Sequence, residues 1–283
     1  RRYITMKKNF IVGVVQLDPR DNYEENLQSA EKWIREGAER GAKLLVLPEV
    51  WTYQGPTPID FAEDIPGGTC FSMLSDLAKE YGIWIHGGSI TERIPGDSVK
   101  TYNTTMVISP EGQLAAKYRK IHTFDVDVEG AGSYRESDRK RSGSEIVVCD
   151  AGDYGKLGLS ICYDIRFPEV FRLQALEGAD ILCLPAAFLM MTGKDHWEPL
   201  IRARAIENGC YMIACGQCGN KPTAHMYGHS MIVDPWGRVI AMAGEEPGVT
   251  TAMIDFEYLE KARNQLYTLQ NRRENVYTLK KND

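Results

Sequence analysis

Three reactive side chains, Glu49, Lys120 and Cys162, each stand at the end of a predicted strand. In α/β sheets, chemistry gathers at the carboxyl ends of strands. A cysteine that attacks a carbonyl or nitrile carbon needs a base to take its proton and a donor for the oxyanion that forms. A glutamate can serve as that base, and a lysine can stabilise the oxyanion. The three residue types together therefore predict nucleophilic catalysis at a sheet edge.

Cys162 lies at the junction of two predicted elements. Residues 156–162 (KLGLSIC) form an apolar run that is typical of a buried strand, and residues 167–169 (FPE) are typical of a helix start with proline in its first turn. The positive end of that helix would favour the thiolate of Cys162, as would a nearby lysine. The residues alone leave other interpretations open. Cys162 can be an inert buried thiol, and Glu49 and Lys120 can be an ion pair or solvated charges.

Strands and helices alternate along the chain. Strands are predicted at residues 10–17, 43–47, 83–90, 101–109, 113–119, 145–149, 157–162, 180–184, 211–215, 230–233, 238–242 and 250–254. Helices are predicted between Asn22 and Gly41, at residues 71–81, 169–177 and 197–208, and from residue 257. Many of the strands are apolar on one or both faces, so we expect sheets covered by helices.

Two segments do not fit this alternation. Residues 123–144 are rich in Gly, Asp, Glu, Arg and Ser, which predicts a long loop, and such loops are usually functional. Residues 270–283 are polar and predicted to be extended. An internal similarity links residues 41–48 (GAKLLVLP) to residues 178–185 (GADILCLP), as expected for two pseudo-symmetric halves.

Composition limits the possible functions. The chain has 283 residues, of which 43% are hydrophobic and 25% charged, an ordinary globular composition. We expect one domain over residues 6–283, preceded by a disordered or cloning-derived leader at residues 1–5. The net charge of -6 argues against nucleic-acid binding, and no apolar run reaches the ~18 residues of a membrane span.

Cysteine usage bears on the compartment. Seven cysteines in a chain without a recognisable secretory signal predict reduced thiols and a cytoplasmic location. Asn103-Thr104-Thr105 matches a glycosylation sequon, which we expect to be idle without secretion.

Three ordered motifs carry a family resemblance. They are Leu47-Pro48-Glu49, Tyr118-Arg119-Lys120-Ile121-His122 and the run from Ile161 to Glu169 (ICYDIRFPE). Their order and separation resemble the signature motifs of the nitrilase superfamily of carbon–nitrogen hydrolases. Residues 227–230 (YGHS) and 233–237 (VDPWG) extend the likeness, which covers the chain from the first strand to Tyr277. The resemblance implies an α-β-β-α sandwich of two mixed sheets covered by helices. It also implies a homodimer or higher homo-oligomer, with residues 265–283 as a C-terminal extension at the subunit interface.

The resemblance also implies a role for each motif residue. Glu49 would be the general base and later the general acid, and Lys120 would stabilise the oxyanion. Cys162 would form a thioester acyl-enzyme that water then hydrolyses, and the backbone N–H of Tyr163 would complete the oxyanion hole. Glu136, within Tyr134-Arg135-Glu136-Ser137, would support the lysine. No cofactor or metal is expected.

Arg166, four residues after Cys162, resembles the carboxylate clamp of related enzymes that act on acid-bearing amides. Tyr53 and Phe188 are candidate pocket walls. Residues 202–207 and 215–219, with His229, resemble amidases that act on deaminated glutathione and on ω-amides of keto acids. We therefore expect a small linear amide with a carboxylate as substrate, with nitriles and N-carbamoyl compounds as alternatives for the same catalytic residues.

Other functions are weighed against this one. The C-x-x-C pair Cys215 and Cys218, followed by His225 and His229, can indicate a metal or redox site, although its spacing departs from the usual patterns. A catalytically inactive binding protein on the same scaffold would be expected to lack a signature residue, and none is lacking. His122 and His196 are interpreted as hydrogen-bonded structural groups.

Overall fold

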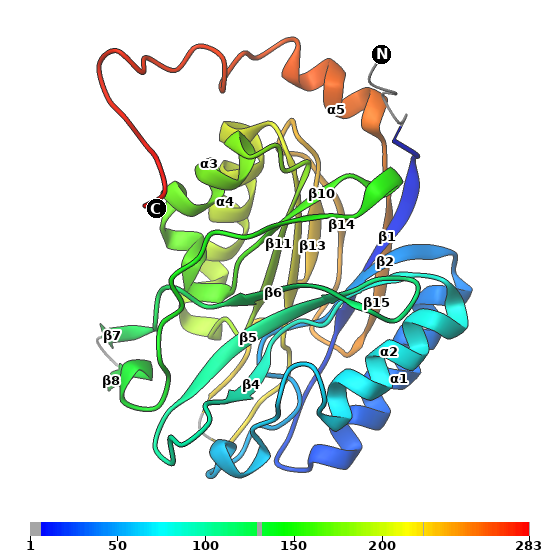
Figure 1. Ribbon diagram of the computed structural model, residues 1–283, viewed down its shortest axis with the longest axis vertical. Helices are drawn as coiled ribbons and strands as arrows, with labels where there is room; N and C mark the ends of the chain where they lie inside the picture. Colours follow the sequence, from blue (N-terminus) through cyan, green and yellow to red (C-terminus); the bar gives the residue numbers. More distant parts are fainter. Residues whose placement is uncertain (1–6, 129–131, 223, 283) are drawn as a thin grey trace.

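The computed structural model describes residues 7–128, 132–222 and 224–282, which form two packed β-sheets between two pairs of helices (Figure 1). The predicted leader at residues 1–5 lies outside the described residues. Among the parts that are described, no helix is both long and apolar enough to cross a membrane.

The first sheet is mixed and has seven strands. In spatial order they are β15 (Gly248–Ile254), β1 (Phe10–Gln16), β2 (Ala42–Val46), β3 (Trp84–His86), β5 (Thr101–Ile108) and β4 (Ile90–Arg93), with β6 (Leu114–Arg119) paired to β5. Strands β1, β2 and β3 run parallel, and the remaining pairings are antiparallel. The outer face of this sheet is covered by α1 (Tyr23–Glu39) and α2 (Thr69–Tyr81).

The second sheet has six strands and its own pair of covering helices. Its order is β14 (Val239–Met242), β13 (Met231–Val233), β12 (Tyr211–Gly216), β11 (Ile181–Ala186), β10 (Lys156–Leu159) and β9 (Val148–Asp150). Its central strands β10, β11 and β12 are parallel. Helices α3 (Pro168–Leu176) and α4 (Met190–Asn208) cover its outer face. The predicted α-β-β-α sandwich of mixed sheets is therefore confirmed.

The side-chain alternation of β5 and β6 decides what reaches the space between the sheets, since successive side chains of a strand point to opposite faces. Val107 and Tyr118 belong to the core that joins the two sheets, whereas Met106 belongs to the core beneath α1 and α2. Side chains that share a face with Val107 and Tyr118, including Asn103 on β5, therefore point toward the second sheet.

Several predicted boundaries differ from the structure. The predicted strand over 83–90 is shorter, and a separate strand, β4, follows it, because Gly87 and Gly88 interrupt the pairing at a left-handed turn. The predicted strand over 145–149 is β9, at Val148–Asp150. The predicted loop over 123–144 contains a hairpin of β7 (Asp125–Val128) and β8 (Gly132–Arg135), whose polar sequence lacks apolar alternation because both strands lie at the surface.

Helix α4 begins at Met190 and not at the predicted Trp197. Its first turns contain Gly193, and Pro199 lies inside the helix, so local propensity argues against helix here. The Tyr227 ring packs against Gly193 so closely that a Cβ there would lie 2.4 Å from it. Tertiary packing therefore determines this part of α4.

The last described residues lie on the surface beside α3. After α5 (Phe256–Arg263) the C-terminal segment crosses the molecule and descends past α3 and α4 (Figure 1). The Lys281 ammonium lies 2.7 Å from the Glu177 carboxylate at the end of α3. This segment exposes apolar side chains, including Val276 and Tyr277.

Candidate active site

Four chain segments bring Glu49, Lys120, Glu136 and Cys162 into one buried cluster. Glu49 follows β2, Lys120 follows β6, Glu136 opens a 3-10 turn after β8, and Cys162 opens another after β10. Their exposed fractions are 4%, 3%, 8% and 8%. The structure thus joins the four residues that the sequence proposed for catalysis.

Lys120 bridges two carboxylates. Its Nζ lies 2.9 Å from Glu49 Oε1 and 2.9 Å from Glu136 Oε2. Burial alone would lower the pKa of Lys120, but Glu136 and Glu49 outweigh it and raise the pKa well above its ordinary value. Burial likewise opposes ionisation of Glu136, yet Lys120 holds the pKa of that carboxyl below its ordinary value. The lysine therefore stays charged, and the cluster of one cation and two carboxyl groups has a formal excess of one negative charge.

Both oxygens of Glu49 are fixed by hydrogen bonds. Oε1 accepts from Lys120 and from Asn103 Nδ2 at 2.8 Å, and Oε2 accepts from the backbone N–H of Ala187 at 2.8 Å. Since Ala187 follows β11, Glu49 is held by both sheets. The carboxylate therefore has a defined orientation in a site closed to bulk water.

The backbone at Glu49 is held as firmly as its side chain. Val50 has φ of 42°, which is a strained value for a β-branched residue. Gln217 Nε2 donates to the Glu49 carbonyl at 2.6 Å, and the Val50 N–H donates to Ser89 Oγ at 3.0 Å. These contacts maintain the turn that aims Glu49 into the cluster.

Cys162 also lies on a strained turn, with φ of 47°. Asp164 stabilises the turn by accepting from the Ile161 N–H at 2.9 Å and from Tyr118 Oη at 2.7 Å. His122 Nδ1 lies 2.7 Å from the other oxygen of Asp164, so this buried carboxylate joins the Lys120 segment to the Cys162 turn. The cysteine and the lysine therefore have a fixed relative position.

The helix end and the lysine were expected to favour the Cys162 thiolate, but the buried site shifts the pKa of this thiol in the opposite direction. Burial and the adjacent Glu49 carboxylate raise the pKa of the Cys162 thiol well above its ordinary value, and Lys120 does not compensate. The following helical turn has only five residues, Cys162–Arg166, before α3 begins. The thiol is therefore protonated at rest, and a nucleophilic reaction needs Glu49 to take its proton as the bond forms.

Arg166 and Phe188 lie together beside the Cys162 turn. The Arg166 guanidinium carbon is 5.5 Å from the centre of the Phe188 ring and 5.8 Å from that of Tyr163. Both Arg166 Nη atoms lie 3.3 Å from His196 Nδ1. No carboxylate of the described residues forms a salt bridge with Arg166, so its positive charge is free for an acidic ligand.

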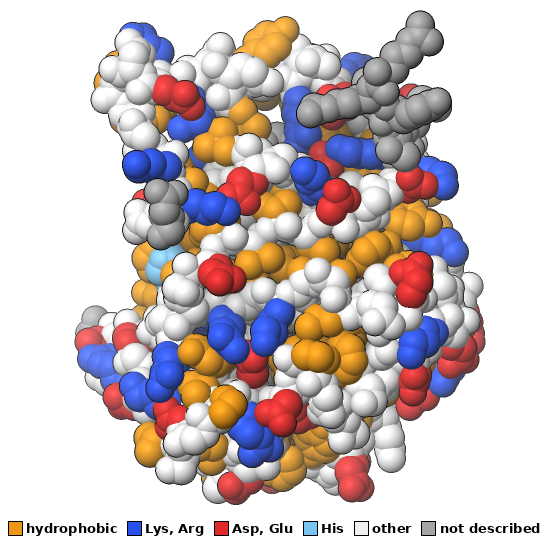
Figure 2. All heavy atoms as spheres, viewed as in Figure 1, with side chains coloured by type: hydrophobic (Ala, Val, Ile, Leu, Met, Phe, Trp, Pro, Cys, Tyr) orange, Lys and Arg blue, Asp and Glu red, His pale blue; other side chains and the backbone are white. Residues whose placement is uncertain are grey.

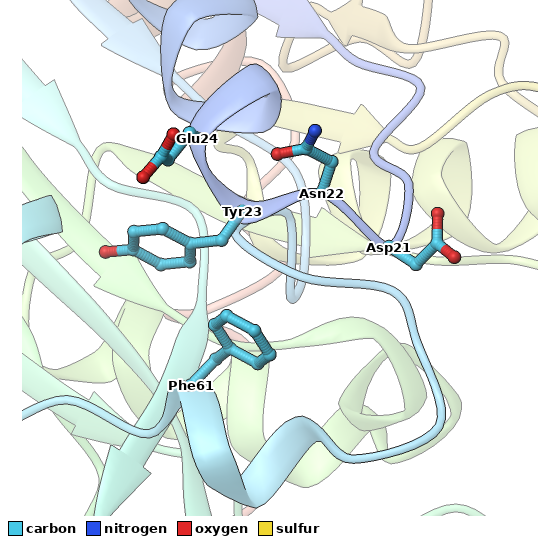
Figure 3. A pocket seen from close by; sticks show the side chains of 5 residues that line it. All are labelled: Asp21, Asn22, Tyr23, Glu24 and Phe61. Atoms are coloured by element: carbon cyan, nitrogen blue, oxygen red, sulfur yellow. The ribbon is translucent and has the colours of Figure 1, made fainter.

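Tyr53 lies in a different aromatic group. Its ring stacks on Phe61 with 3.9 Å between centres, and Phe61 stacks in turn on Tyr23. Figure 3 shows Phe61 and Tyr23 beside an open surface cavity of about 420 Å³ that Asp21, Asn22 and Glu24 also line. The structure groups Tyr53 with this stack, and its role as a pocket wall stays a prediction.

The competing metal and redox interpretation gains no support. Cys215 and Cys218 are fully buried, and Cys215 Sγ donates to the Val15 carbonyl at 3.2 Å. Within the described ranges, no three His, Cys, Asp or Glu side chains are placed to hold a metal ion. His122 and His196 are hydrogen-bonded to Asp164 and Arg166, as predicted for structural groups.

The sequence interpretation missed three residues that contact or orient the buried cluster, namely Asn103, Asp164 and Gln217. Asn103 matched only a sequon, and its side chain is buried. The first half of the predicted strand over 101–109 is polar throughout (TYNTT), so no sequence signal singles out Asn103. Gln217 stands inside the C-x-x-C pair, where the cysteines drew attention instead.

Comparisons with known proteins agree with this geometry. The carbon–nitrogen hydrolase family model matches residues 11–264. The chain is 41% identical over 269 residues to a deaminated glutathione amidase of Synechocystis, covering 94% of this chain and 98% of that protein. It is 42% identical over 273 residues to omega-amidase NIT2-B of Xenopus laevis, covering 95% of both.

A solved structure also matches the fold of this chain. Saccharomyces cerevisiae Nit3, described as a member of branch 10 of the nitrilase superfamily, superposes with a TM-score of 0.84 at 34% identity, covering 93% of this chain and 96% of that one. The predicted resemblance and the predicted enzyme class are therefore confirmed. Because the family model spans most of the sequence and the relatives align over nearly their whole length, the chain belongs to the carbon–nitrogen hydrolase family.

Proposed function

We propose that this chain hydrolyses the amide bond of a small linear amide that carries a carboxylate, through a thioester on Cys162. The observation that carries the proposal is the buried Lys120 between Glu49 and Glu136, next to a protonated cysteine. The amidase names of the Synechocystis and Xenopus relatives support the reaction type.

Acylation of Cys162 begins with proton transfer to Glu49. Cys162 Sγ attacks the amide carbon as its proton moves to the Glu49 carboxylate. The carbonyl oxygen becomes an oxyanion, which the Lys120 ammonium and the Tyr163 N–H stabilise. Glu49 then returns the proton to the departing nitrogen, the carbon–nitrogen bond breaks, and ammonia or an amine leaves.

Deacylation repeats the same steps with water. The oxygen of a water molecule attacks the thioester carbon while Glu49 takes a proton from that water, and Lys120 again stabilises the oxyanion. The carbon–sulfur bond then breaks and the proton returns to Cys162. Glu136 keeps Lys120 charged and in place throughout, because its own pKa is held low by the same contact.

Arg166 would select the acidic end of the substrate. A guanidinium can bind a carboxylate with two parallel hydrogen bonds, and this one has no acidic partner among the described residues. Phe188 lies against it and would cover the apolar part of a short chain, with Tyr53 as a more distant wall. The proposed reaction uses no cofactor.

We also propose a cytoplasmic homodimer. All seven cysteines are free and buried, as expected in a reducing compartment. Apolar side chains are exposed near α3 and α4 and on the C-terminal segment, among them Leu176, Ile206 and Trp236. A second copy of the chain covering this face would bury them.

A substrate panel tests the proposal. Ammonia release is measured with α-ketoglutaramate, an N-carbamoyl amino acid and a simple nitrile, and amine release with deaminated glutathione, for wild type and Arg166→Lys. We expect turnover of one of the two acid-bearing amides, with KM raised at least about 10-fold in the variant because the bidentate contact is lost. Turnover of the nitrile or the N-carbamoyl compound alone would overturn the amide assignment. An unchanged KM would remove Arg166 as the clamp.

A further inference from the structure

Asn103 occupies the centre of the catalytic cluster although no signature motif contains it. It lies on β5 with an exposed fraction of 2%, on the face that points toward the second sheet. Its carbonyl oxygen accepts from the Lys120 N–H at 2.9 Å. The backbone of Asn103 therefore helps to fix the residue whose side chain bridges the two carboxylates.

The side-chain amide of Asn103 contacts both of those carboxylates. Nδ2 lies 2.8 Å from Glu49 Oε1 and 3.4 Å from Glu136 Oε1. An ionised carboxylate only accepts hydrogen bonds, so the NH₂ group of the amide, which has two hydrogens, must face them. Asn103 and Lys120 thus join the same two acids, one as a neutral donor and the other as a cation.

The carbonyl oxygen of the Asn103 side-chain amide lacks a hydrogen bond in the part of the chain that is described. Asn103 Oδ1 is buried and has no hydrogen-bond partner among the described residues. A buried acceptor without a partner costs free energy, which an apolar side chain of similar size would avoid. The fold therefore carries a cost at this position, and the NH₂ contacts to the carboxylates offset it.

We propose that Asn103 is a positioning residue that holds Glu49 and Glu136 at a fixed separation and stabilises the excess negative charge they share. With Oε1 held by Asn103 and Lys120, Glu49 directs Oε2 toward the backbone N–H of Ala187. This inference rests on the proposed role of Glu49 as the base. The ionisable groups that face the pair are Lys120 and Cys162, with Tyr134 and Lys140 also within electrostatic range.

Two substitutions separate positioning from structural support. Asn103→Leu removes both polar ends at similar size, and Asn103→Asp keeps the shape but adds a third negative charge. We expect kcat to fall about 100-fold in each, with KM within about threefold, because the base is displaced while the substrate contacts remain. We also expect the acid limb of the pH–rate profile to move to higher pH, and further in Asn103→Asp, because a lost donor or an added negative charge favours protonation of the acids.

Thr105→Val is the matched control. Thr105 lies two residues along β5 on the same face, is also fully buried, and contacts His86 Nε2 at 3.3 Å rather than a catalytic group. It should keep kcat and the pH profile of wild type. Thermal unfolding of all three variants shows which of them fold.

A second readout does not require the substrate to be known. The rate at which iodoacetamide alkylates Cys162 is followed against pH by peptide mass spectrometry. The sulfur–carbon bond forms as iodide leaves, and the thiol proton must be taken up by the base. In the plot of alkylation rate against pH, the acid limb should move to higher pH in folded Asn103→Leu or Asn103→Asp. It should not move in Thr105→Val. If wild type hydrolyses no panel substrate but this shift appears, the proposed function fails and the positioning role stands. An unshifted limb in a folded variant overturns the inference.

Discussion

Strand β6 and Lys120, the residue that follows it, supply cations to two ion clusters of opposite composition, one on each face of the first sheet. The outer ion cluster consists of Glu92, Lys117, Arg119 and Thr104. Glu92 accepts from Lys117 Nζ at 2.8 Å, from Arg119 Nε and Nη2 at 2.8 Å each, and from Thr104 Oγ1 at 2.7 Å. Basic and acidic side chains accordingly gather over β4, β5 and β6 on the face shown in Figure 2.

The inner ion cluster consists of Lys120, Glu49, Glu136 and Asn103. Here one cation lies between two carboxylates, and an amide replaces the hydroxyl. Thr104 and Asn103 are neighbours on β5, so adjacent residues of one strand contribute to the two clusters. Neighbouring residues on β5 and at the end of β6 therefore contribute to one cluster with a formal excess of positive charge and to another with a formal excess of negative charge.

The difference between the clusters supports the proposal that the inner one is the catalytic site. Burial opposes ionisation of Glu92, but the hydrogen bonds from Arg119 and Lys117 outweigh it and lower its pKa. The side chains of Lys117 and Arg119 are 30% and 38% exposed, so water shares their charge. The inner cluster is nearly closed to water, keeps one excess negative charge and has a protonated thiol beside it. The inner cluster therefore combines a thiol with an adjacent carboxylate, as the proposed proton transfer requires.

The largest expected effect comes from removing the nucleophile. Cys162→Ala deletes one atom from the inner site and should lower turnover at least about 1000-fold, because no acyl-enzyme can form. Its melting temperature should stay close to that of wild type. Cys183→Ala, at another fully buried cysteine of the second sheet, is the control and should keep turnover. Residual turnover near wild type in Cys162→Ala would exclude Cys162 as the nucleophile.

Lysine substitutions on the two faces of β6 should differ in stability as well as activity. Lys120→Met leaves two buried carboxylates facing each other, which should lower the free energy of unfolding by about 3–5 kcal/mol and abolish turnover. Lys117→Met leaves Glu92 paired with Arg119, and the lysine is partly exposed, so we expect a loss of about 1 kcal/mol or less and normal turnover. Urea unfolding at pH 7 measures both variants. Equal losses of stability would contradict the contrast between the clusters.

His86 should make stability depend on pH, because it lies on the inner face without a charged partner. Burial lowers the pKa of His86 to about 4, and its Nδ1 has no hydrogen-bond partner among the described residues. Below pH ~6.5 the imidazole of His86 binds a proton in the unfolded chain but not in the folded chain. The free energy of unfolding therefore has its full value above pH ~6.5 and falls as the pH drops toward 4. The loss should approach about 3 kcal/mol.

The contribution of His86 is isolated by comparing wild type with His86→Leu in urea unfolding between pH 7 and pH 4. The variant should lack this part of the acid destabilisation. If the two curves have the same slope with pH, then burial does not lower the pKa of His86 in the folded protein.

The sequence predicts the layered fold and the reactive residues better than it predicts the segments that hold those residues in place. Glu49, Lys120 and Cys162 stand at strand ends in recognisable motifs, so their meeting could be predicted from local pattern. The hairpin that carries Glu136 could not be predicted, because its polar strands pair at the surface without an apolar face. Helix α4 starts earlier than predicted because packing overrides Gly193 and Pro199.

The electrostatics of Cys162 were also beyond the sequence. The pattern showed a strand leading toward a helix, which suggested a stabilised thiolate. The three-dimensional site adds burial and the Glu49 carboxylate, which reverse the direction of the pKa change. Asn103 was missed for a related reason, since only the alternation of β5 shows that its side chain reaches the acids on the inner face.

The most direct test compares two isosteric changes, one in each cluster. Ammonia release from α-ketoglutaramate, or amine release from deaminated glutathione if that is the substrate, is measured for Glu49→Gln and Glu92→Gln. We expect Glu49→Gln to lower kcat at least about 1000-fold because the base is lost. We expect Glu92→Gln to keep kcat within about threefold while lowering stability by about 2 kcal/mol. Near-normal turnover in Glu49→Gln, or an equal loss of kcat in both folded variants, would contradict the assignment of catalysis to the inner ion cluster.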